Sequence, residues 1–386
     1  MLGQMEEFKE IAHCGGQVSI HVETCEDGQR TVQFGVRSSR PTPSAWFAIY
    51  ALPEGIPMAT VALGGIGLQT DPPPTLTYFL VLIGSDSHGL YGHQCMKCNG
   101  YWRSKSAPSR WLLTCPYCGL RTETHEFLTP GQRRYVDACC KFFRDAINSL
   151  KDGEHIINMD AVTDSVEKDG VKPKFYYTEE TQQNKFECPA CGDYNDILGR
   201  YGYCSNCGTH NGVFELEHDM RIIQERITEA ENFEACVKDA VSSFDSFARQ
   251  IVKQLAIRVP MTPTRQKEWQ KKLFHNLKPC ADSLREVFDI HIFKGMKEDD
   301  IQFACLMFFR RHVYEHNGGE ADDKYIKESR DNSVRPKQML HETTESAHKI
   351  TRLITTMGRN IHDGFHQIFP PEETALKSKL NRSRSR

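Results

Sequence analysis

The stretch IQFACLMFFRRHVYEHNGGEADD, residues 301–323, decides the fold of the C-terminal part of this chain. Its first nine residues are apolar almost without interruption, on every side of a helical wheel. A helix of this kind is buried on all faces, which predicts that residues 298–317 form the central helix of a bundle. Gly318 and Gly319 follow, and glycine just past the last turn is the usual sign of a helix end.

Four charged or titratable side chains interrupt this apolar helix near its end, namely Arg310, Arg311, His312 and His316. Charges at the end of a buried helix are costly unless a groove, a partner or a ligand takes them up. Such a conflict between local chemistry and burial is expected where a protein carries its function.

Arg311 and His316 have the chemistry needed to act on a phosphate. They are five residues apart, about 7.5 Å of helical rise, which is too far for them to pair but suitable for bracketing one phosphate. Arginine supplies a permanent charge and a planar fork, and histidine gives or takes a proton near neutral pH. Together they are a minimal set for breaking RNA without a metal, with the 2′-OH as nucleophile. The same spacing also occurs by chance in chains without such an activity.

The segment RHVYEHNGG, residues 311–319, resembles the signature of the HEPN superfamily, small helical bundles that often act as metal-independent RNA endonucleases. The motif of that family is an arginine, a polar residue, a few variable residues and a histidine, which here match Arg311, His312 and His316. The resemblance covers roughly residues 217–370.

The resemblance implies a site and partners. Arg311 would hold the scissile phosphate, His316 would be the general acid or base, and His312 and Asn317 would orient them or extend the hydrogen bonding. It further implies an RNA substrate, a homodimer or higher homo-oligomer with a composite site, and a role in toxins or antiviral defence with a protein or phage-derived trigger. Two alternatives stay open, a non-catalytic module that binds nucleic acid or protein, and a bundle that only dimerises.

Length and composition set the broad class. A chain of 386 residues predicts two to four domains, and 39% hydrophobic residues are enough for real cores. The formal net charge of −3 provides no global attraction to nucleic acid or membranes. No apolar run approaches the length of a membrane-spanning helix, and the N-terminal residues MLGQMEEFKE lack a signal-peptide core. The sequence therefore predicts a cytoplasmic protein.

Fifteen cysteines are present, and eight of them form four C-x-x-C pairs. In a long intracellular chain this spacing predicts metal binding rather than disulfides. Sixteen residues separate the two pairs of the first group and twelve separate those of the second, which is the zinc-ribbon pattern. We expect two structural zinc ions per chain, because four thiolates leave no position for water. The predicted ligands are Cys95, Cys98, Cys115 and Cys118 in the first ribbon, and Cys188, Cys191, Cys204 and Cys207 in the second.

Aromatic and cationic side chains alternate between the first two cysteine pairs, where such a pattern is suited to stacking bases and holding phosphates. The candidate nucleic-acid contacts are Trp102, Arg103, Lys105, Arg110 and Trp111. The alternative is that both tryptophans cover the small core of the ribbon while the cations are solvated.

The rest of the chain predicts a multidomain α+β protein. Its segments are a β-rich domain at residues 1–92, a zinc ribbon at 93–128, a helical segment and linker at 129–185, a second ribbon at 186–214, a HEPN-like all-α bundle at 215–370, and a basic disordered tail at 371–386. Val-, Ile- and Thr-rich runs predict strands at residues 17–24, 31–37, 46–52, 59–63 and 77–83. Thr129 to Gln132 carry a capping-box pattern that starts a helix, and Tyr135, Val136 and Phe143 follow at helical spacing within residues 134–150, as in a packing helix. Further helices are expected at residues 156–166, 217–257, 265–274, 280–288 and 336–368.

Overall fold

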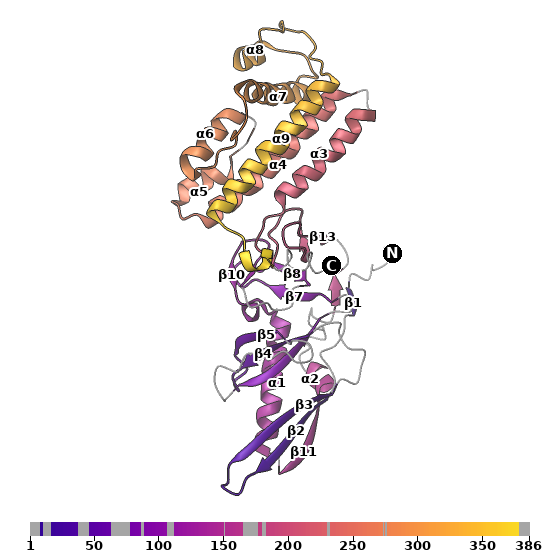
Figure 1. Ribbon diagram of the computed structural model, residues 1–386, viewed down its shortest axis with the longest axis vertical. Helices are drawn as coiled ribbons and strands as arrows, with labels where there is room; N and C mark the ends of the chain where they lie inside the picture. Colours follow the sequence, from indigo (N-terminus) through magenta and orange to yellow (C-terminus); the bar gives the residue numbers. More distant parts are fainter. Residues whose placement is uncertain are drawn as a thin grey trace, which may run out of the picture. The chain divides into compact units, whose positions relative to one another are not determined.

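The structure is a computed structural model of the 386-residue chain. It describes residues 8–10, 17–37, 46–62, 78–85, 89–105, 112–149, 151–164, 177–179, 183–229, 232–272, 274 and 276–377. The chain divides into two compact units, Met1–Gly208 with Glu372–Arg386, and Thr209–Pro371. Figure 1 shows strands in the first unit and long helices in the second. The predicted α+β organisation is thereby confirmed.

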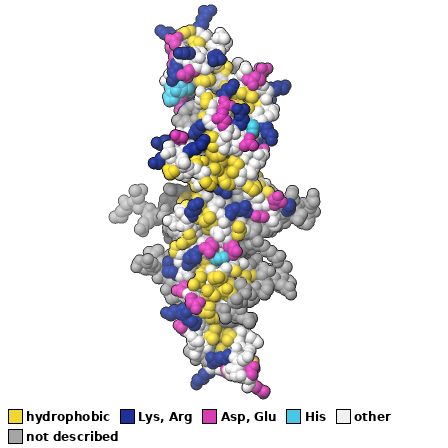
Figure 2. All heavy atoms as spheres, turned by 90° about the vertical axis from the view of Figure 1, so that its left-hand side faces the viewer, with side chains coloured by type: hydrophobic (Ala, Val, Ile, Leu, Met, Phe, Trp, Pro, Cys, Tyr) yellow, Lys and Arg dark blue, Asp and Glu magenta, His cyan; other side chains and the backbone are white. Residues whose placement is uncertain are grey.

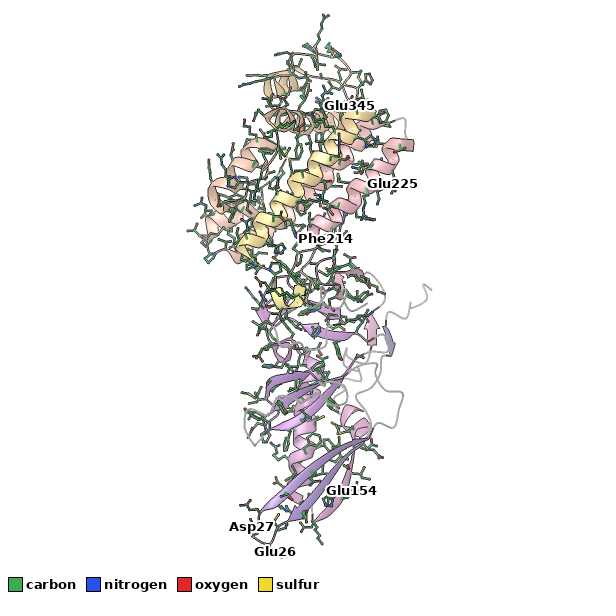
Figure 3. The ribbon with its side chains drawn as sticks, viewed as in Figure 1. Glu26, Asp27, Glu154, Phe214, Glu225 and Glu345 are labelled. Atoms are coloured by element: carbon green, nitrogen blue, oxygen red, sulfur yellow. The ribbon has the colours of Figure 1, made fainter. Side chains whose placement is uncertain are left out.

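The first unit begins with two small antiparallel sheets. Their strand orders are β11-β2-β3 and β5-β4-β6, built from β2 (Gln17–Thr24), β3 (Arg30–Arg37), β4 (Trp46–Ala51), β5 (Pro57–Ala62), β6 (Phe79–Gly84) and β11 (Gly153–Asn158). Alternation along β2 buries Val18, Ile20 and Val22. Figure 3 labels Glu26 and Asp27 at the tip of the β2–β3 hairpin and Glu154 on the neighbouring β11.

Helix α1 (Pro130–Ser149) packs onto these sheets and closes their core. It contributes Tyr135, Val136 and Phe143, which the helical spacing of the sequence predicted to be buried. A capping box starts it, because the Gln132 N–H donates to Thr129 Oγ1 (3.1 Å) and the Thr129 N–H donates to Gln132 Oε1 (2.9 Å).

The prediction of a helix at residues 156–166 is wrong for residues 156–158. Residues 153–158 instead form β11, which pairs antiparallel with β2, and α2 (Met159–Asp164) begins only afterwards. The physical reason is that the adjacent β-branched Ile156 and Ile157 lie in an alternating half-buried pattern that extends the β2–β3 sheet. In the predicted linker, β12 (Tyr177–Glu179) pairs with β1 (Phe8–Glu10).

The two cysteine-rich segments share one four-stranded sheet. Its order is β13-β14-β8-β7, from β7 (Tyr91–Gln94), β8 (Tyr101–Ser104), β13 (Gln183–Glu187) and β14 (Tyr194–Leu198). The first cysteine pair of each ribbon lies between two of these strands, and β14 of the second ribbon pairs with β8 of the first. Two further backbone bonds join the ribbons, from the Thr114 N–H to Ser205 O (2.8 Å) and from the Tyr203 N–H to Pro116 O (2.9 Å).

Short elements complete the ribbons. They are β9 (Leu113–Thr114), β10 (Arg121–Thr122) and η1 (Thr124–Phe127). Residues 372–377 also return to this unit, where the Glu372 N–H donates to Cys207 O (2.8 Å) and Arg121 donates to the Glu372 carboxylate (2.7 Å). Ala375 is buried against the second cysteine group. Residues 378–386 of the predicted basic tail lie outside the described residues.

The second unit is helical. Its helices are α3 (Gly212–Glu229), α4 (Phe233–Arg258), α5 (Pro263–Gln270), α6 (Leu277–Phe288), α7 (Glu298–His316), α8 (Asp323–Ser329) and α9 (Thr344–Ile368). Helices α3, α4 and α9 pack side by side, with α7 and α8 at one end of them (Figure 1). Gly358 of α9 allows this approach, because a Cβ there would lie 2.4 Å from Leu216 of α3. None of the helices in the described ranges has the length and apolar character needed to span a bilayer.

Three predictions for this unit are wrong. The helix expected at residues 336–368 begins only at Thr344, because Thr343 and Ser346 form a capping box there. The single helix expected at residues 217–257 is two helices, because the Asn232 side chain accepts the Ala235 N–H (2.9 Å) and starts α4 afresh. The central helix is α4, whose buried residues run through its whole length, and not α7. On α7 the buried side chains are Ala304, Met307, Phe308 and Val313, while the outer apolar residues are only half-covered.

The surface drawn in Figure 2 mixes both signs of charge. Lysine and arginine side chains are interspersed there with aspartate and glutamate side chains. This agrees with the formal net charge of −3. Binding of a polyanion would therefore depend on a local group of cations rather than on the field of the whole molecule.

Candidate metal centres and candidate active site

The first cysteine group is arranged to hold a metal ion. The Sγ atoms of Cys95 and Cys118 are 3.7 Å apart, as are those of Cys98 and Cys115, and all four lie within 4.8 Å of one another. Tetrahedral coordination with zinc–sulfur bonds of about 2.3 Å would separate the sulfurs by about 3.8 Å. The donor set and its spacing therefore fit a tetrahedral metal ion.

The second group repeats this geometry. Cys188 and Cys207 have their Sγ atoms 3.7 Å apart, and those of Cys191 and Cys204 are 3.6 Å apart. The Asn195 amide donates to Cys204 Sγ (3.4 Å). Such donors orient ligands and spread the charge of a thiolate. Four thiolates this close would repel one another strongly, so a cation among them is the arrangement that the site favours.

A common turn shapes all four cysteine pairs. The fourth residue after the first cysteine of each pair has a positive φ and donates its backbone N–H to the carbonyl of that cysteine. These residues are Asn99, Gly119, Gly192 and Gly208, with φ of 56°, 67°, 75° and 76°. Asparagine and glycine are the residues that tolerate this conformation best. Gly100, the residue after Asn99, lies against the ring of Tyr117.

Two of the candidate nucleic-acid contacts are buried. Trp102 is fully buried, stacks on His93 with ring centroids 5.2 Å apart, and meets Phe127 edge-on at 5.0 Å. Arg103 is 2% exposed and forms an ion pair with Asp196 of the second ribbon. Trp102 thus covers the ribbon core, as the alternative interpretation expected, and Arg103 connects the two ribbons.

The other candidates have different positions. Lys105 is exposed, and its Nζ lies 5.2 Å above the ring centre of Tyr194. Arg110 and Trp111 lie outside the described residues. A nucleic-acid contact at the first ribbon is therefore left to Lys105 among the candidates whose structure is described.

The first arginine at the end of α7 is a structural residue. Arg310 donates to Glu342 Oε1 (3.0 Å), to Asp331 Oδ2 (3.1 Å) and to the Tyr325 hydroxyl (3.3 Å). Burial opposes the charge of Arg310, but the hydrogen bond and charge of Glu342 outweigh it and raise the arginine pKa. The Tyr314 hydroxyl also donates to Glu342 Oε1 (2.6 Å). This network fastens the segment after α7 back onto the helix.

Sequence reasoning noted Arg310 as a charge in an apolar helix but did not find its partners. Asp331 and Glu342 follow it by 21 and 32 residues, and no local spacing connects them. The signal that was available is the burial itself, since a buried arginine requires carboxylates.

Arg311 and His316 point in different directions. Arg311 Nη2 lies 2.8 Å from Glu315 Oε2 on the next turn, and its side chain is 13% exposed. Five residues at about 100° each place His316 about 140° away from Arg311 around the helix. One copy of α7 therefore does not present both side chains to a single phosphate.

The histidines of the motif lie together. The rings of His312 and His316 are one turn apart with centroids 4.6 Å from each other, and both side chains are exposed. Asn317 ends α7, and its Nδ2 donates to Asp322 Oδ2 (2.9 Å). Asp322 in turn caps α8 by accepting the Tyr325 N–H (2.7 Å).

A pocket of about 210 Å³ lies beside His312, between α7 and α8. It is lined by Asn276, Phe308, Phe309, His312, Val313, Asp322, Lys324, Tyr325 and Glu328. The structure therefore places His312 in the lining of a pocket, with His316 against the His312 ring and Asn317 hydrogen-bonded to Asp322 of that lining. Arg311 lies on another side of the helix.

Comparison of the chain with protein-family models, with curated proteins and with solved structures gave no match. The similarity to the HEPN superfamily accordingly rests on the motif at residues 311–319 alone. The zinc-ribbon assignment rests on the two Cys₄ groups and their geometry.

Proposed function

We propose that this chain is a metal-independent RNA endonuclease in which His312 and His316 are the acid–base pair. The observation that carries the proposal is the contact between the two exposed rings, whose centroids are 4.6 Å apart, with His312 in the lining of the α7–α8 pocket. Their approach gives a single site two groups that can exchange protons, which a lone histidine does not provide.

The chemistry needs one base and one acid. The base takes the proton of a 2′-OH, whose oxygen forms a new bond to the adjacent phosphorus. The bond from phosphorus to the 5′-oxygen breaks, and the acid protonates that oxygen as it leaves. The products are a 2′,3′-cyclic phosphate and a 5′-hydroxyl, and DNA is inert because it lacks the nucleophile.

Arg311 would stabilise the phosphate from a second copy of the chain. Because Arg311 and His316 are about 140° apart on one helix, a homodimer offers a way to place both on one phosphate. Arg311 must then leave Glu315, which its Nη2 contacts at 2.8 Å. A two-pronged contact with phosphate is stronger than that pair.

We further propose that the ion in both Cys₄ groups is zinc with a structural role. The eight cysteines supply four sulfur ligands to each ion, which closes the coordination sphere. The zinc sites then stabilise the shared sheet and take no part in cleavage.

A second candidate function is a non-catalytic module that binds nucleic acid or protein. The observation that favours it is the ion pair between Arg311 and Glu315, which occupies the arginine that the motif assigns to phosphate. In that case the chain would bind RNA or a partner without changing it.

The test is incubation of the purified protein with structured RNA, with and without EDTA, followed by analysis of the product ends. We expect cleavage that survives EDTA and leaves 2′,3′-cyclic phosphate. His316→Ala and His312→Ala should each slow it by about 10²–10⁴-fold. His341→Ala, at an exposed histidine elsewhere in the same unit, is the matched control. RNA binding without cleavage would favour the second candidate, and a strict need for magnesium would contradict the first.

A further inference from the structure

The α7–α8 pocket is sized for one ring system. Its volume of about 210 Å³ is below the roughly 300–1,000 Å³ of pockets that hold drug-sized ligands. It opens beside His312, so a ligand in it would lie next to the proposed site of cleavage. A single nucleobase adjacent to the scissile phosphate has the right size and place.

Three aromatic side chains are part of its lining. Phe308 is 2% exposed and Phe309 is half-buried, and the ring of Tyr325 lies on the α8 side. Hydrogen bonds from the Tyr325 hydroxyl to Asp331 (2.7 Å) and from Arg310 to that hydroxyl (3.3 Å) hold this ring in place. Bases that are unstacked from RNA are commonly received by aromatic side chains held in this way.

The polar lining is rich in hydrogen-bond acceptors. Asp322 and Glu328 are both carboxylates, and Asn276 adds an amide. Asp322 already accepts hydrogen bonds from Asn317 and Tyr325. Within the described part of the chain, the exposed Glu328 carboxylate has no hydrogen-bond or ion-pair partner. Glu328 therefore offers two acceptor oxygens to a ligand.

A carboxylate is also unsuited to receive phosphate, because the two charges repel each other. Lys324, on the same helix, is the cation of the lining that can contact a phosphate outside the pocket. The carboxylates of the lining therefore suit a neutral base, and Lys324 suits the phosphate backbone.

We propose that this pocket selects guanine at the position next to the cleaved phosphate, an inference that rests on the proposed RNA cleavage. Guanine is the RNA base whose pairing edge carries two adjacent donors, N1–H and N2–H₂, which match the two oxygens of Glu328. Its O6 accepts a hydrogen bond from the Asn276 amide. Adenine and cytosine place an acceptor nitrogen beside their amino group, which would face a carboxylate oxygen and repel it.

Binding of uncleavable mononucleotides tests the base preference without relying on catalysis. We expect the full-length protein to bind 3′-GMP about tenfold or more tightly than 3′-AMP, 3′-CMP or 3′-UMP in calorimetric titrations, in line with one bidentate contact. The matching inosine nucleotide lacks the N2 amino group and should bind more weakly than 3′-GMP. Glu328→Gln should remove the preference, because an amide offers one acceptor and one donor. Glu320→Gln, at an exposed glutamate outside the lining, should keep it.

Cleavage mapping separates this inference from the proposed function. Cuts in a random-sequence RNA should cluster at guanine in the parent protein and lose that bias in Glu328→Gln, with an unchanged unfolding midpoint as proof of folding. Binding selective for 3′-GMP with no RNA cleavage would support the guanine pocket and contradict the endonuclease. Cleavage with equal use of the four bases, or a guanine preference that survives Glu328→Gln, would overturn the guanine pocket and leave the endonuclease standing.

Discussion

Arg103 and Asp196 lie directly opposite each other on β8 and β14, and their buried ion pair joins the two ribbons. The side chains are 2% and 0% exposed. An ion pair taken out of water depends on both partners, since either one alone would be an uncompensated buried charge. The ion pair therefore holds two segments about ninety residues apart in sequence in one sheet.

Arg103→Met should lower the free energy of unfolding of the ribbon unit by about 3–5 kcal/mol, because it leaves Asp196 charged and buried. Thermal or urea denaturation of the zinc-loaded protein measures the change. The double variant Arg103→Met/Asp196→Leu is the control, and it should recover most of the loss because an apolar pair has no charge to desolvate. Equal instability of the single and double variants would contradict this account of the pair.

The shared sheet also predicts that the two metal sites are lost together. Cys204→Ser removes one ligand of the second group, and zinc binding at such sites is itself folding energy. The Thr114–Ser205 and Pro116–Tyr203 backbone bonds then lose their partners, which weakens the first ribbon. Elemental analysis should find two zinc ions per parent chain and fewer than one per variant chain. A variant that retains one full zinc would show that the ribbons fold independently.

A histidine cluster in the helical unit predicts how its stability depends on pH. His210 is 1% exposed, its Nδ1 accepts the Gly212 N–H (3.1 Å), and its own backbone N–H donates to His366 Nε2 (3.1 Å). His362 stands one turn before His366 and meets the ring of Phe214, labelled at the start of α3 in Figure 3, at 5.8 Å. Burial lowers the pKa of both His210 and His362 to about 3, and the nearby charge of His366 is the second cause.

The sign of the effect follows from the two states. An unfolded histidine binds a proton near pH 6.5, whereas these folded ones do so near pH 3, so the unfolded chain binds more protons in between. The contribution of these two histidines to the free energy of unfolding is complete above pH 6.5. It falls as the pH drops below 6.5, by about 1–2 kcal/mol per histidine at pH 5. Urea midpoints of the helical transition at pH 7.5 and pH 5 should show the loss. His362→Phe should show a smaller loss, and an identical pH dependence in that variant would contradict the assignment.

Local patterns in the sequence were sufficient for much of this fold. The strands predicted at residues 17–24 and 31–37 follow from their Val-, Ile- and Thr-rich runs, the start of α1 follows from Thr129 and Gln132, and the eight cysteine ligands follow from their spacing. Each of these features depends on residues within a few positions of one another. Where a structure depends on distant partners, as β14 on β8 or Arg310 on Glu342, no short-range pattern reveals it.

The residues of the candidate site also fall into those that a local pattern reveals and those that only distant packing brings together. The motif itself located His312, which lines the pocket, His316, which lies against His312, and Asn317, which donates to Asp322 of the lining. The pocket also needs Asn276 and Glu328, which lie outside the motif and reach it only through the packing of α6 and α8 against α7. The direction of Arg311 could have been anticipated, because a helix turns about 100° per residue and separates positions five apart.

The neighbours Arg310 and Arg311 should respond to substitution in opposite ways. Arg310→Met leaves Asp331 and Glu342 without their cation, so it should cost about 3–5 kcal/mol of unfolding free energy. Arg311→Lys keeps a charge beside Glu315 and leaves no carboxylate without a cation, so it should cost clearly less unfolding free energy than Arg310→Met. It should nevertheless slow RNA cleavage markedly, because a point ammonium does not make the two-pronged contact with phosphate that arginine makes.

Urea denaturation and cleavage rates of both variants, measured well below their unfolding midpoints, separate the two roles. Arg311→Gln adds a check, since it removes the charge as well and should cleave no faster than Arg311→Lys. Should Arg310→Met remain stable yet lose cleavage while Arg311→Lys keeps the parental rate, the phosphate contact would belong to Arg310. The buried network would then be a resting arrangement that RNA displaces, because the same guanidinium does not serve Glu342 and a phosphate through the same donors.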